Sequence, residues 1–454
     1  MHCFRAIKRR VIGRLCSSER LGCACALMLA ASITNTVRAQ QGPATEYGAS
    51  PVLGAPQKSL LPTLHVARAV GWPAGAKPTA AAGLSVSAFA TGLDHPRWLY
   101  VLPNGDVLVA ESDAPPKPDD SKGILGKVRK WIMKRAGSGA RPSANRITLL
   151  RDTRGDGTAP ERHLFLQGLN SPIGMTLIGG DFFVADSDAL LRFTYHTGDT
   201  EIHTQPVRVT DLPAGAINHH WTKSLIASPD GRKLYVGVGS NSNAAENGLG
   251  VETERSSVWE IDPQTGSHRI FASGLRNPVG LAFEPESGVL WVAVNERDEL
   301  GDHLPPDYMT SVRDGAFYGW PFSYYGQHVD ARVKPQNADL VAAAVPPDYA
   351  LGAHTASLGL CWSDDAKLPG LQHGMFVGQH GSWNRKTRSG YKVLFVNFSR
   401  GKPVGLPVDV LTGFLDSYGE ALGRPVGVAI DKHGALLVAD DVGNAIWRVT
   451  GSNR

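Results

Sequence analysis

The sequence predicts an all-β fold, a six-bladed β-propeller of four-stranded blades with a site at the mouth of its central channel. A blade-start motif, Gly-Leu-x-x-Pro, recurs along the chain, and short alternating strands follow each copy, whereas long helical periodicity is nearly absent. Repeats of about 40–50 residues with four short strands each are typical of propellers. The 454 residues include 51 Gly and 30 Pro, which suits a chain with many turns.

The blade-start motif is clearest in the first repeat. Gly92–Pro96 leads into an expected strand at Trp98–Leu102, a turn at Pro103–Asp106 and a second expected strand at Val107–Ala110. The turn contains Asn-Gly, which between alternating strands is a strong signal for a β-hairpin.

The motif prolines and two weaker units give the number of repeats. The prolines stand at positions 96, 172, 278 and 425, at intervals of 76, 106 and 147 residues. The last two intervals are about twice the length of a blade, and each contains one further unit, at Leu225–Val238 and Leu358–Gly378. The chain is therefore expected to carry six repeats.

Residues 1–39 have the features of a secretory signal peptide. Six Lys and Arg residues precede a 13-residue apolar run, Leu21–Ile33, and small residues follow before Gln40. The run is shorter than the about 20 residues that a membrane-spanning helix needs. A signal anchor and the twin-arginine route, signalled by Arg9 and Arg10, are the alternatives. We expect a periplasmic or secreted protein with no transmembrane segment in its mature chain.

Removing residues 1–39 changes both the charge and the cysteine count. The chain has a formal charge of +4, but this segment contains seven of its Lys and Arg residues and one Glu, which leaves −2. A nearly neutral chain gives no signal for nucleic-acid binding, so no nucleic-acid partner is expected. Of the five cysteines only Cys361 remains, so no internal disulfide is expected.

Two segments flank or interrupt the repeats. Residues 40–82 are rich in Pro, Gly and Ala and are expected to form a linker or a strap over the surface of a propeller domain at 83–454. Residues 113–146 are a basic insertion with a helix-like part at Gly123–Ala136. The insertion is interpreted as a solvated loop or as a docking surface for an acidic redox partner or anionic lipid.

Three polar clusters stand where innermost strands are expected to begin or end, so a propeller would bring them together. His219 and His220 form the first; a histidine is a competent base for a hydroxyl proton, although such a pair can equally be structural. Arg276 and Asn277 form the second and suit an anionic or quinonoid ligand, or a structural ion pair. The third is loop 295–307, whose carboxylates and free carbonyls suit Ca²⁺.

Several common kinds of site are absent from the sequence. It contains no zinc-ligand spacing, no nucleophile elbow and no dinucleotide-binding fingerprint. The residues alone therefore predict an exported propeller with a basic and polar channel mouth, and they leave its reaction open.

The motifs around these clusters resemble the soluble pyrroloquinoline quinone (PQQ) sugar dehydrogenases, the glucose/sorbosone dehydrogenase family. The similarity spans residues 84–450 and includes His220, the run Gly274–Phe283 and Tyr318-Gly319-Trp320-Pro321, in this order. The stretches 218–247 and 378–385 are more similar to the sorbosone dehydrogenase branch. The resemblance implies hydride transfer from an aldose or a sorbosone-like aldehyde to PQQ, with a cytochrome or a quinone as the electron acceptor.

The resemblance also implies roles for single residues. His220 matches the general base, Arg276 the cation that polarises the quinone carbonyl, and Asn277 a contact of the cofactor. Arg424 matches the first of two arginines that hold the cofactor's carboxylates, and Val426 stands where glucose-oxidising relatives have the second.

Other positions depart further from those relatives. A lysine contact of the cofactor falls near His380, and Arg385 is expected to replace its charge. In the calcium loop, Arg297 and Asp298 replace a Gly-Pro pair whose carbonyls bind the metal. Because backbone ligation survives substitution, Arg297 and Asp298, together with Asp302, are the predicted metal ligands.

Two other functions remain open at this stage. One is a propeller that binds a glycan or a protein without catalysis, since fold does not fix function. The other is a calcium-dependent hydrolase of the lactonase kind, which would need Asp, Asn and Glu side chains converging in the channel. The sequence leaves the oligomeric state and the identity of the sugar undetermined.

Overall fold

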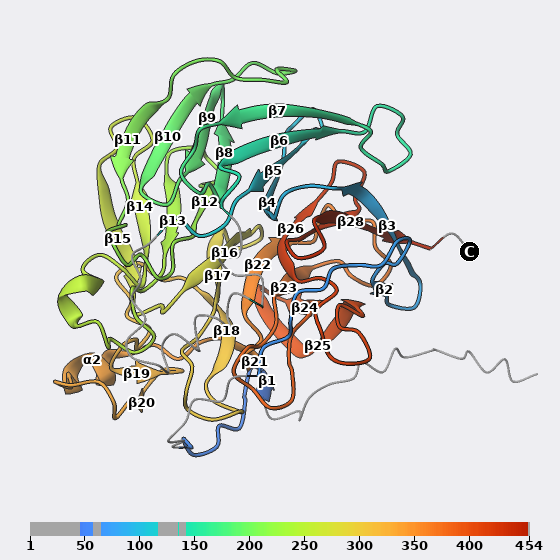
Figure 1. Cartoon of the computed structure of the whole chain (residues 1–454). Coiled ribbons are helices and arrows are strands. Elements are labelled where there is room, and N and C mark those ends of the chain that lie inside the picture. Colours follow the sequence, from blue (N-terminus) through green and yellow to red (C-terminus); the bar gives the residue numbers. More distant parts are fainter. Residues whose placement is uncertain (1–45, 58–64, 117–134, 136–141, 453–454) are drawn as a thin grey trace, which may run out of the picture. The chain divides into compact units, whose positions relative to one another are not determined.

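The computed structural model describes residues 46–57, 65–116, 135 and 142–452, which all lie in one compact unit, Ala39–Arg454. The predicted signal peptide, and the 113–146 insertion apart from its ends and Arg135, lie outside these residues. Six sheets of four or five antiparallel strands surround a common centre (Figure 1). The prediction of an all-β, six-bladed propeller is confirmed.

The first three blades follow one another along the chain. Blade 1 contains β4 (Pro96–Val101), β5 (Val107–Glu111), β6 (Arg146–Arg151) and β7 (Glu161–Gln167). Blade 2 contains β8 (Gly174–Ile178), β9 (Asp181–Ala185), β10 (Ala189–Thr194) and β11 (Val207–Asp211). Blade 3 contains β12 (Lys223–Ala227), β13 (Leu234–Val238), β14 (Ser257–Ile261) and β15 (His268–Ser273).

The other three blades each include a strand from the N-terminal part of the chain. Blade 4 contains β16 (Pro278–Glu284), β17 (Val289–Val294), β18 (Pro306–Ser311), β21 (Tyr349–Ala353) and β1 (Tyr47–Gly48). Blade 5 contains β22 (Ser357–Trp362), β23 (Gly374–Gln379), β24 (Lys392–Ser399), β25 (Lys402–Thr412) and β2 (Thr79–Ala80). Blade 6 contains β26 (Pro425–Ile430), β27 (Leu436–Asp440), β28 (Ala445–Gly451) and β3 (Leu84–Thr91).

The innermost strands form a closed ring. Strands β4, β8, β12, β16, β22 and β26 contact one another in this order, and β26 contacts β4. Glycines on these strands allow neighbouring backbones to approach: a Cβ at Gly280 would lie 2.5 Å from the carbonyl oxygen of Leu358, and one at Gly359 would lie 2.2 Å from that of Val426. Outside this ring, buried apolar clusters join each blade to the next.

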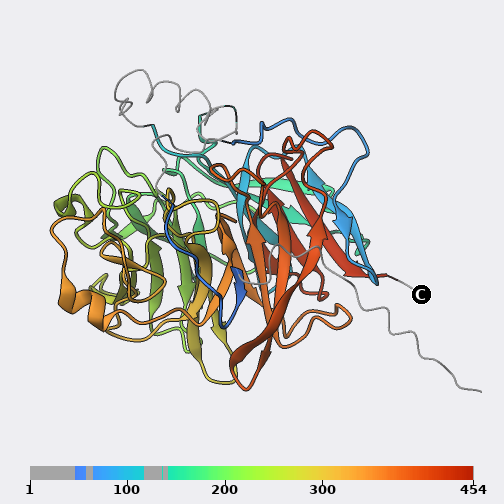
Figure 2. The same cartoon turned by 90° about the horizontal axis from the view of Figure 1, so that it is seen from below.

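The described parts of residues 46–80, here called the strap, run along blades 4 to 6 (Figure 2). β1 pairs with β21, and β2 pairs with β25. This is the segment for which the sequence predicted a linker or a surface strap, and it adds strands to two outer blade edges.

One excursion interrupts blade 4 between β18 and β21. It carries β19 (Ser323–Tyr324), β20 (His328–Val329) and the helix α2 (Ala338–Ala343), and blade 3 carries a short 3₁₀ helix, η2 (Leu249–Glu252). Among the described residues, none of the helices is both long and apolar enough to cross a membrane.

Candidate active site

A cavity of about 220 Å³, here called the mouth cavity, lies where the innermost strands begin. Five blades contribute to its lining, among them through Arg97, His220, Asn277, His380 and Arg424. One side of it is apolar, because Val279 and Leu358 line it and pack with Val426 in a buried cluster. Val426 stands where glucose-oxidising relatives are expected to have a second arginine, and here it lies in an apolar contact.

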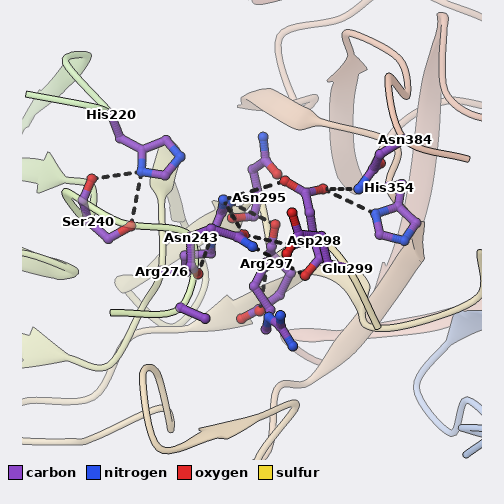
Figure 3. Close-up of polar contacts among 12 residues, drawn as sticks. His220, Ser240, Asn243, Arg276, Asn295, Arg297, Asp298, Glu299, His354 and Asn384 are labelled. Atoms are coloured by element: carbon purple, nitrogen blue, oxygen red, sulfur yellow. Dashed lines mark hydrogen bonds and ion pairs between the residues drawn. The ribbon is translucent and has the colours of Figure 1, made fainter. Parts of the chain in front are cut away.

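His220, just before β12, is fixed through its Nδ1 atom. Nδ1 lies 2.7 Å from the carbonyl oxygen of Ser240 and 3.0 Å from its Oγ (Figure 3). Ser240 is fixed in turn, since its Oγ donates to the carbonyl oxygen of Ser242 at 2.6 Å. A carbonyl oxygen only accepts hydrogen bonds, so Nδ1 carries the proton and Nε2 keeps its lone pair. No described residue occupies Nε2 with a hydrogen bond.

The surroundings of His220 keep its ring neutral. Burial, the Arg276 guanidinium and His219 together lower the pKa of His220 well below its usual value of 6.5. The His219 ring stands perpendicular to the His220 ring, with centroids 4.8 Å apart, and His219 is exposed. Of the two candidate bases, His220 is therefore the one that is oriented, half-buried and unprotonated at neutral pH.

The turn before His220 is held in a strained conformation. Asn218 has a φ of 38°, in the left-handed region that few non-glycine residues adopt. The buried Arg255 braces this turn: its guanidinium donates to Asn218 Oδ1 at 2.9 Å and to the carbonyl oxygens of Gly239 and Pro213 at 3.1 and 3.0 Å. The brace fixes the backbone from which His220 projects.

The guanidinium of Arg276 is saturated by oxygens of this chain. It donates to the carbonyl oxygens of Glu296 and Asn295 at 2.7 and 3.1 Å and to Asn243 Oδ1 at 3.0 Å (Figure 3). Its Nη2 also lies 3.7 Å from the carboxylate of Asp298. Arg276 is 3% exposed and is not among the residues that line the mouth cavity. Its positive charge therefore affects the pKa of His220 although its guanidinium does not line the cavity.

Asn277 lines the mouth cavity and carries an unpaired acceptor that is buried in the cavity wall. Its Oδ1 is buried and has no hydrogen-bond partner among the described residues. Gly239 makes the arrangement possible, because a Cβ there would lie 2.3 Å from Asn277 Oδ1 and 2.5 Å from the Cβ of His220. The amide of Asn277 and the base are thus packed against the same glycine.

The side chains at the predicted calcium-binding positions are engaged in other contacts. The carboxylate of Asp298 accepts a hydrogen bond from Asn384 Nδ2 at 2.6 Å and lies 3.3 Å from His354 Nδ1 (Figure 3). Arg297 is 1% exposed, and its Nη1 lies 3.0 Å from the carboxylate of Asp330.

Asp302, the third predicted ligand, is half-buried and does not line the mouth cavity. Calcium takes about six to eight oxygen ligands. Among the described residues, no group of three or more His, Cys, Asp or Glu side chains could hold a metal ion. These side chains do not fit a calcium site, and no step below is derived through the metal.

Asp441 gathers basic side chains on the opposite wall. Its Oδ2 lies 2.6 Å from Arg97 Nη1, 2.9 Å from His380 Nε2 and 3.6 Å from His95 Nε2. Burial alone would raise the pKa of Asp441, but His380, His95 and Arg97 hold it well below its usual range. Burial lowers the pKa of His380 to about 4, so His380 is a neutral donor, and Arg97 is the cation that balances the charge of Asp441.

Arg424 lies on the same wall and is held by backbone oxygens. Its Nη1 donates to the carbonyl oxygen of His380 at 3.3 Å, and its Nη2 to that of Ala67, in the strap, at 3.1 Å. Its guanidinium carbon lies 4.9 Å from the ring centroid of Tyr391. Its Nε is buried and has no partner among the described residues.

Trp72, also in the strap, supports the backbone of Arg424 through Asp440. The Arg424 N–H donates to Asp440 Oδ1 at 2.7 Å, while Oδ2 accepts from Trp72 Nε1 at 2.7 Å and from Trp447 Nε1 at 2.9 Å. Gly423 leaves room for the indole, since a Cβ there would lie 2.7 Å from Trp72 Nε1. The strap therefore forms part of the wall behind Arg424.

Arg385 lies outside the mouth cavity. Its Nη1 and Nη2 donate to the carboxylate of Glu46 at 2.8 and 3.2 Å, and Nη1 also donates to the carbonyl oxygen of Ala353 at 3.1 Å. Both charged residues are buried. Arg385, whose charge was expected to replace that of a lysine near the cofactor, therefore holds the strap through Glu46.

The structure separates the predicted site residues into two groups. Those that line the mouth cavity are His220, Asn277, His380 and Arg424, and those that do not are Arg276, Arg297, Asp298, Asp302 and Arg385.

The cavity also contains residues that the sequence analysis did not single out, namely Arg97, Trp221, Trp383 and Asp441. Arg97 follows the motif proline of blade 1, as Val279 and Val426 follow those of blades 4 and 6. Aligning the blade starts would have identified it.

A family model and two curated relatives match this chain. A family model described as TrAA12-like matches residues 143–308 and 324–452. An uncharacterized protein of Borreliella burgdorferi is 30% identical over 248 residues, 52% of this chain and 62% of that protein. The aldose sugar dehydrogenase YliI of Escherichia coli is 28% identical over 180 residues, 37% of this chain and 47% of that protein. The chain thus spans less than two thirds of these curated relatives.

Solved structures resemble the propeller as a whole. The holo PQQ domain of pyranose dehydrogenase from Coprinopsis cinerea has a TM-score of 0.65 at 20% identity and covers 85% of this chain and 100% of that one. A calcium structure of the AA12 family enzyme of Trichoderma reesei has a TM-score of 0.65 at 19% identity, covering 86% and 99%. PQQ-bound aldose sugar dehydrogenase from Streptomyces coelicolor reaches 0.51 at 16% identity, covering 82% and 99%. At these identities the likeness establishes the fold.

Proposed function

Because the chain belongs to the TrAA12-like family, we propose that it is a PQQ-dependent dehydrogenase that oxidises a sugar. The predicted membership of the soluble PQQ-dependent sugar dehydrogenases is confirmed at the level of this family, whereas the sorbosone branch stays a prediction. The observation that carries the proposal is His220, a neutral histidine with a free Nε2, in a cavity that also holds two arginines and an unpaired amide oxygen.

The residues of the mouth cavity fit an anionic quinone. Arg424 lines the cavity as a cation, whereas the charge of Arg97 is balanced by Asp441. Each of the two arginines has a buried Nε without a partner among the described residues. Asn277 Oδ1 is an unpaired acceptor that suits an N–H group. Arg97, Arg424, Asn277 and His380 would hold the cofactor. Bound there, PQQ would supply an ortho-quinone that accepts the hydride of the sugar carbon.

His220 is suited to remove the proton of the sugar hydroxyl. Nε2 accepts that proton, while the Nδ1–H bond to Ser240 keeps the ring in the required tautomer and stabilises the imidazolium that forms. Arg276 was predicted to polarise the quinone, but its donors are saturated by loop oxygens. We assign it a positioning role: it orders loop 295–298 and, by its charge, keeps His220 unprotonated.

The finer parts of the prediction extend this proposal. The substrate is an aldose or a sorbosone-like aldehyde, and the electrons pass on to a cytochrome or a quinone. Export to the periplasm or the medium follows from the sequence of residues 1–39. Calcium remains a prediction from resemblance, supported by the calcium structure of the Trichoderma protein and not by the predicted side chains.

A spectroscopic titration tests the proposal. PQQ, with and without Ca²⁺, is added to the protein, and the absorption of the bound quinone is followed before and after each member of a panel of sugars. We expect a bound-quinone spectrum that one or more sugars bleach. The matched control is His220→Ala, which leaves the cofactor-binding residues intact and should bind PQQ without being bleached by sugar. Absence of PQQ binding by the folded protein would refute the proposal.

Neither alternative function is favoured by a specific observation. A lactonase-type hydrolase would need a cluster of metal-binding carboxylates, and none is found among the described residues. A propeller that only binds a glycan would not need a histidine with a fixed tautomer and a lowered pKa. The titration separates these alternatives, because only the dehydrogenase reduces the quinone with sugar.

A further inference from the structure

A basic and apolar surface lies where the strap crosses blades 5 and 6, and the proposed function does not use it. It is called here the strap patch, and its residues are Arg68, Val70, Arg135, Lys386, Arg388 and Tyr418. Tyr418 is 86% exposed and Val70 is 44% exposed. Among the described residues, no large hydrophobic side chain is more exposed than that of Tyr418.

Hydrogen bonds join the strap to the loop that carries Tyr418. The Ala421 N–H donates to the carbonyl oxygen of Arg68 at 2.8 Å, and the Val70 N–H donates to that of Ala421 at 2.9 Å. Arg388 joins the same surface, because its Nη2 donates to the carbonyl oxygen of Val66, in the strap, at 3.2 Å. These residues therefore lie side by side.

The other two cations of the strap patch lie against the same part of the strap. The Ala69 N–H donates to the carbonyl oxygen of Arg135 at 3.0 Å. His65 Nδ1 lies 3.2 Å from the carbonyl oxygen of Arg385, the residue before Lys386. The side chains of Arg135 and Lys386 are both exposed. The strap patch is thus one continuous surface.

The strap patch has more cations than carboxylates beside it. Arg68, Lys386 and Arg388 form no ion pair among the described residues. The nearby carboxylates of Asp416 and Glu420 are held by backbone groups instead: Asp416 accepts from the Glu420 N–H at 2.8 Å, and Glu420 accepts from the Arg68 N–H. An acidic partner would therefore find cations here that are free to pair with it.

The blade 3 side of the mouth has the opposite charge. It carries Glu246, Glu252 and Glu254, of which Glu246 and Glu254 are exposed. Glu252 accepts a hydrogen bond from the Asn241 N–H at 2.7 Å, and Asn241 Oδ1 accepts from the N–H of His219, which lines the mouth cavity, at 2.9 Å. Like charges repel, so an acidic partner is directed away from blade 3 and toward the strap patch.

The strap patch is also close to the mouth cavity. Arg424 lines the cavity, and its Nη2 donates to the carbonyl oxygen of Ala67 at 3.1 Å. Ala67 is fully buried, whereas its direct neighbour Arg68 is exposed. Only the thickness of the strap therefore separates the strap patch from a residue that would hold the cofactor. Because electron tunnelling slows steeply with distance, this is a favourable side for electrons to leave.

We propose that the strap patch is the docking surface of the electron acceptor, and that this acceptor is a haem protein with an acidic face. The inference rests on the proposed function. Each sugar that is oxidised yields two electrons and two protons, so two ferric haems are reduced to the ferrous state and the protons pass to water. An exposed aromatic side chain surrounded by arginines has the composition of a protein–protein interface.

The first test uses cytochrome c with succinylated lysines, which is acidic, and native cytochrome c, which is basic. The PQQ-loaded protein is supplied with a sugar that reduces the cofactor. We expect the succinylated form to be reduced faster than the native form at low ionic strength, and added salt to slow its reduction.

The matched variants change two cations each. Arg68→Glu with Lys386→Glu should lower the rate constant for succinylated cytochrome c about tenfold. The same pair should leave reduction of 1,4-benzoquinone, a small neutral acceptor, within about twofold. The control pair is Arg232→Glu with Lys432→Glu, at exposed positions in the turns after the innermost strands β12 and β26. Equal losses in the two pairs would overturn the inference.

A binding measurement separates this inference from the proposed function. Surface plasmon resonance of the cofactor-free protein over immobilised succinylated cytochrome c reports docking without turnover. We expect binding that Tyr418→Ser weakens about tenfold and that the control pair does not weaken, with thermal unfolding showing that each variant is folded. Such binding would support the strap patch even if no sugar reduced the quinone. Equal binding of native cytochrome c, or binding to phosphatidylglycerol vesicles and to neither cytochrome, would overturn the inference.

Discussion

The two charged walls of the mouth cavity are built in different ways. On the wall of blades 3 and 4, the contacts that fix His220 and Arg276 join residues within the stretch from His220 to Asp298. On the wall of blades 5 and 6, Arg424 is held by Ala67, 357 positions earlier in the chain. The wall with the base is self-contained, whereas the wall with the cofactor arginine needs the strap.

The walls also differ in how many polar atoms they leave unpaired. The guanidinium of Arg276 has partners at all three nitrogens. Across the cavity, the Nε atoms of Arg97 and Arg424 and the Oδ1 of Asp441 are buried without partners among the described residues. On the wall of blades 3 and 4, Asn277 Oδ1 is unpaired in the same way. Since a buried polar group without a hydrogen bond is costly, the side formed by blades 5, 6 and 1 has more such groups for a ligand to satisfy.

The largest expected effect comes from removing the base on the wall of blades 3 and 4. His220→Ala should lower turnover by about 10²–10⁴, the usual contribution of a general base, because it removes the neutral imidazole whose Nδ1 is fixed by Ser240 and whose Nε2 has no partner among the described residues. The measurement is steady-state dye reduction in the PQQ-loaded protein. His219→Ala is the control, since His219 is exposed. Near-normal turnover of His220→Ala together with a large loss in His219→Ala would reverse the assignment of the base.

The next largest effect comes from a substitution in the strap that weakens the support of Arg424, at a residue that does not line the cavity. Trp72→Phe keeps a ring but removes the N–H that donates to Asp440. Leaving that carboxylate short of a partner should cost about 1–3 kcal/mol of unfolding free energy, measured by urea denaturation. PQQ affinity should weaken, because Arg424 is fixed through Asp440, while the pH dependence of turnover stays the same.

The control for that variant is Trp362→Phe. Trp362 Nε1 has no hydrogen-bond partner among the described residues, so the same exchange loses no such bond. Equal losses of stability and of PQQ affinity in both variants would show that the strap has no special role in placing Arg424.

A smaller effect concerns the charge behind the base. Burial and, after it, the charge of Arg276 lower the pKa of His220, so a base that must be unprotonated stays active to below pH 6.5. Arg276→Met should raise that pKa and move the acid limb of the kcat/KM profile upward in pH, while Arg276→Lys should leave the limb in place. The position of the limb is the readout, because a loss of rate alone could follow from disordering loop 295–298. An unmoved limb in Arg276→Met would contradict the electrostatic role.

The last effect concerns a buried carboxyl of the same wall, and it acts on stability and not on turnover. Burial raises the pKa of Glu296 from 4.5 to about 7, so between these values the folded protein binds more protons than the unfolded chain. The free energy of unfolding should therefore fall as pH rises from 4.5 to 7, by at most about 1.4 kcal/mol per pH unit. Glu296→Gln should flatten this dependence in thermal unfolding measured across that range. An unchanged pH dependence in Glu296→Gln would show that a group other than Glu296 binds the proton.

The sequence predicted the part of the site that is local. The blade-start motifs give the six repeats because each repeat has its own turns and alternation, and they place His220 and Asn277 at the channel mouth. Sequence could not predict that Glu46 pairs with Arg385 or that Ala67 supports Arg424, because these contacts join residues more than 300 positions apart. The motif could not predict the direction of the Arg276 guanidinium either. That direction depends on which loop oxygens are free to accept hydrogen bonds from it.

The closure of the ring in blade 6 has a consequence for how this chain is made. β3 pairs with β28 from Leu84↔Gly451 to Thr91↔Ala445, so β3 leaves the ribosome more than 350 residues before its partner. Until then its backbone donors and acceptors are open to other strands, and such edges promote aggregation. A chaperone that shields the early segment during synthesis would protect β3 until the last strand arrives.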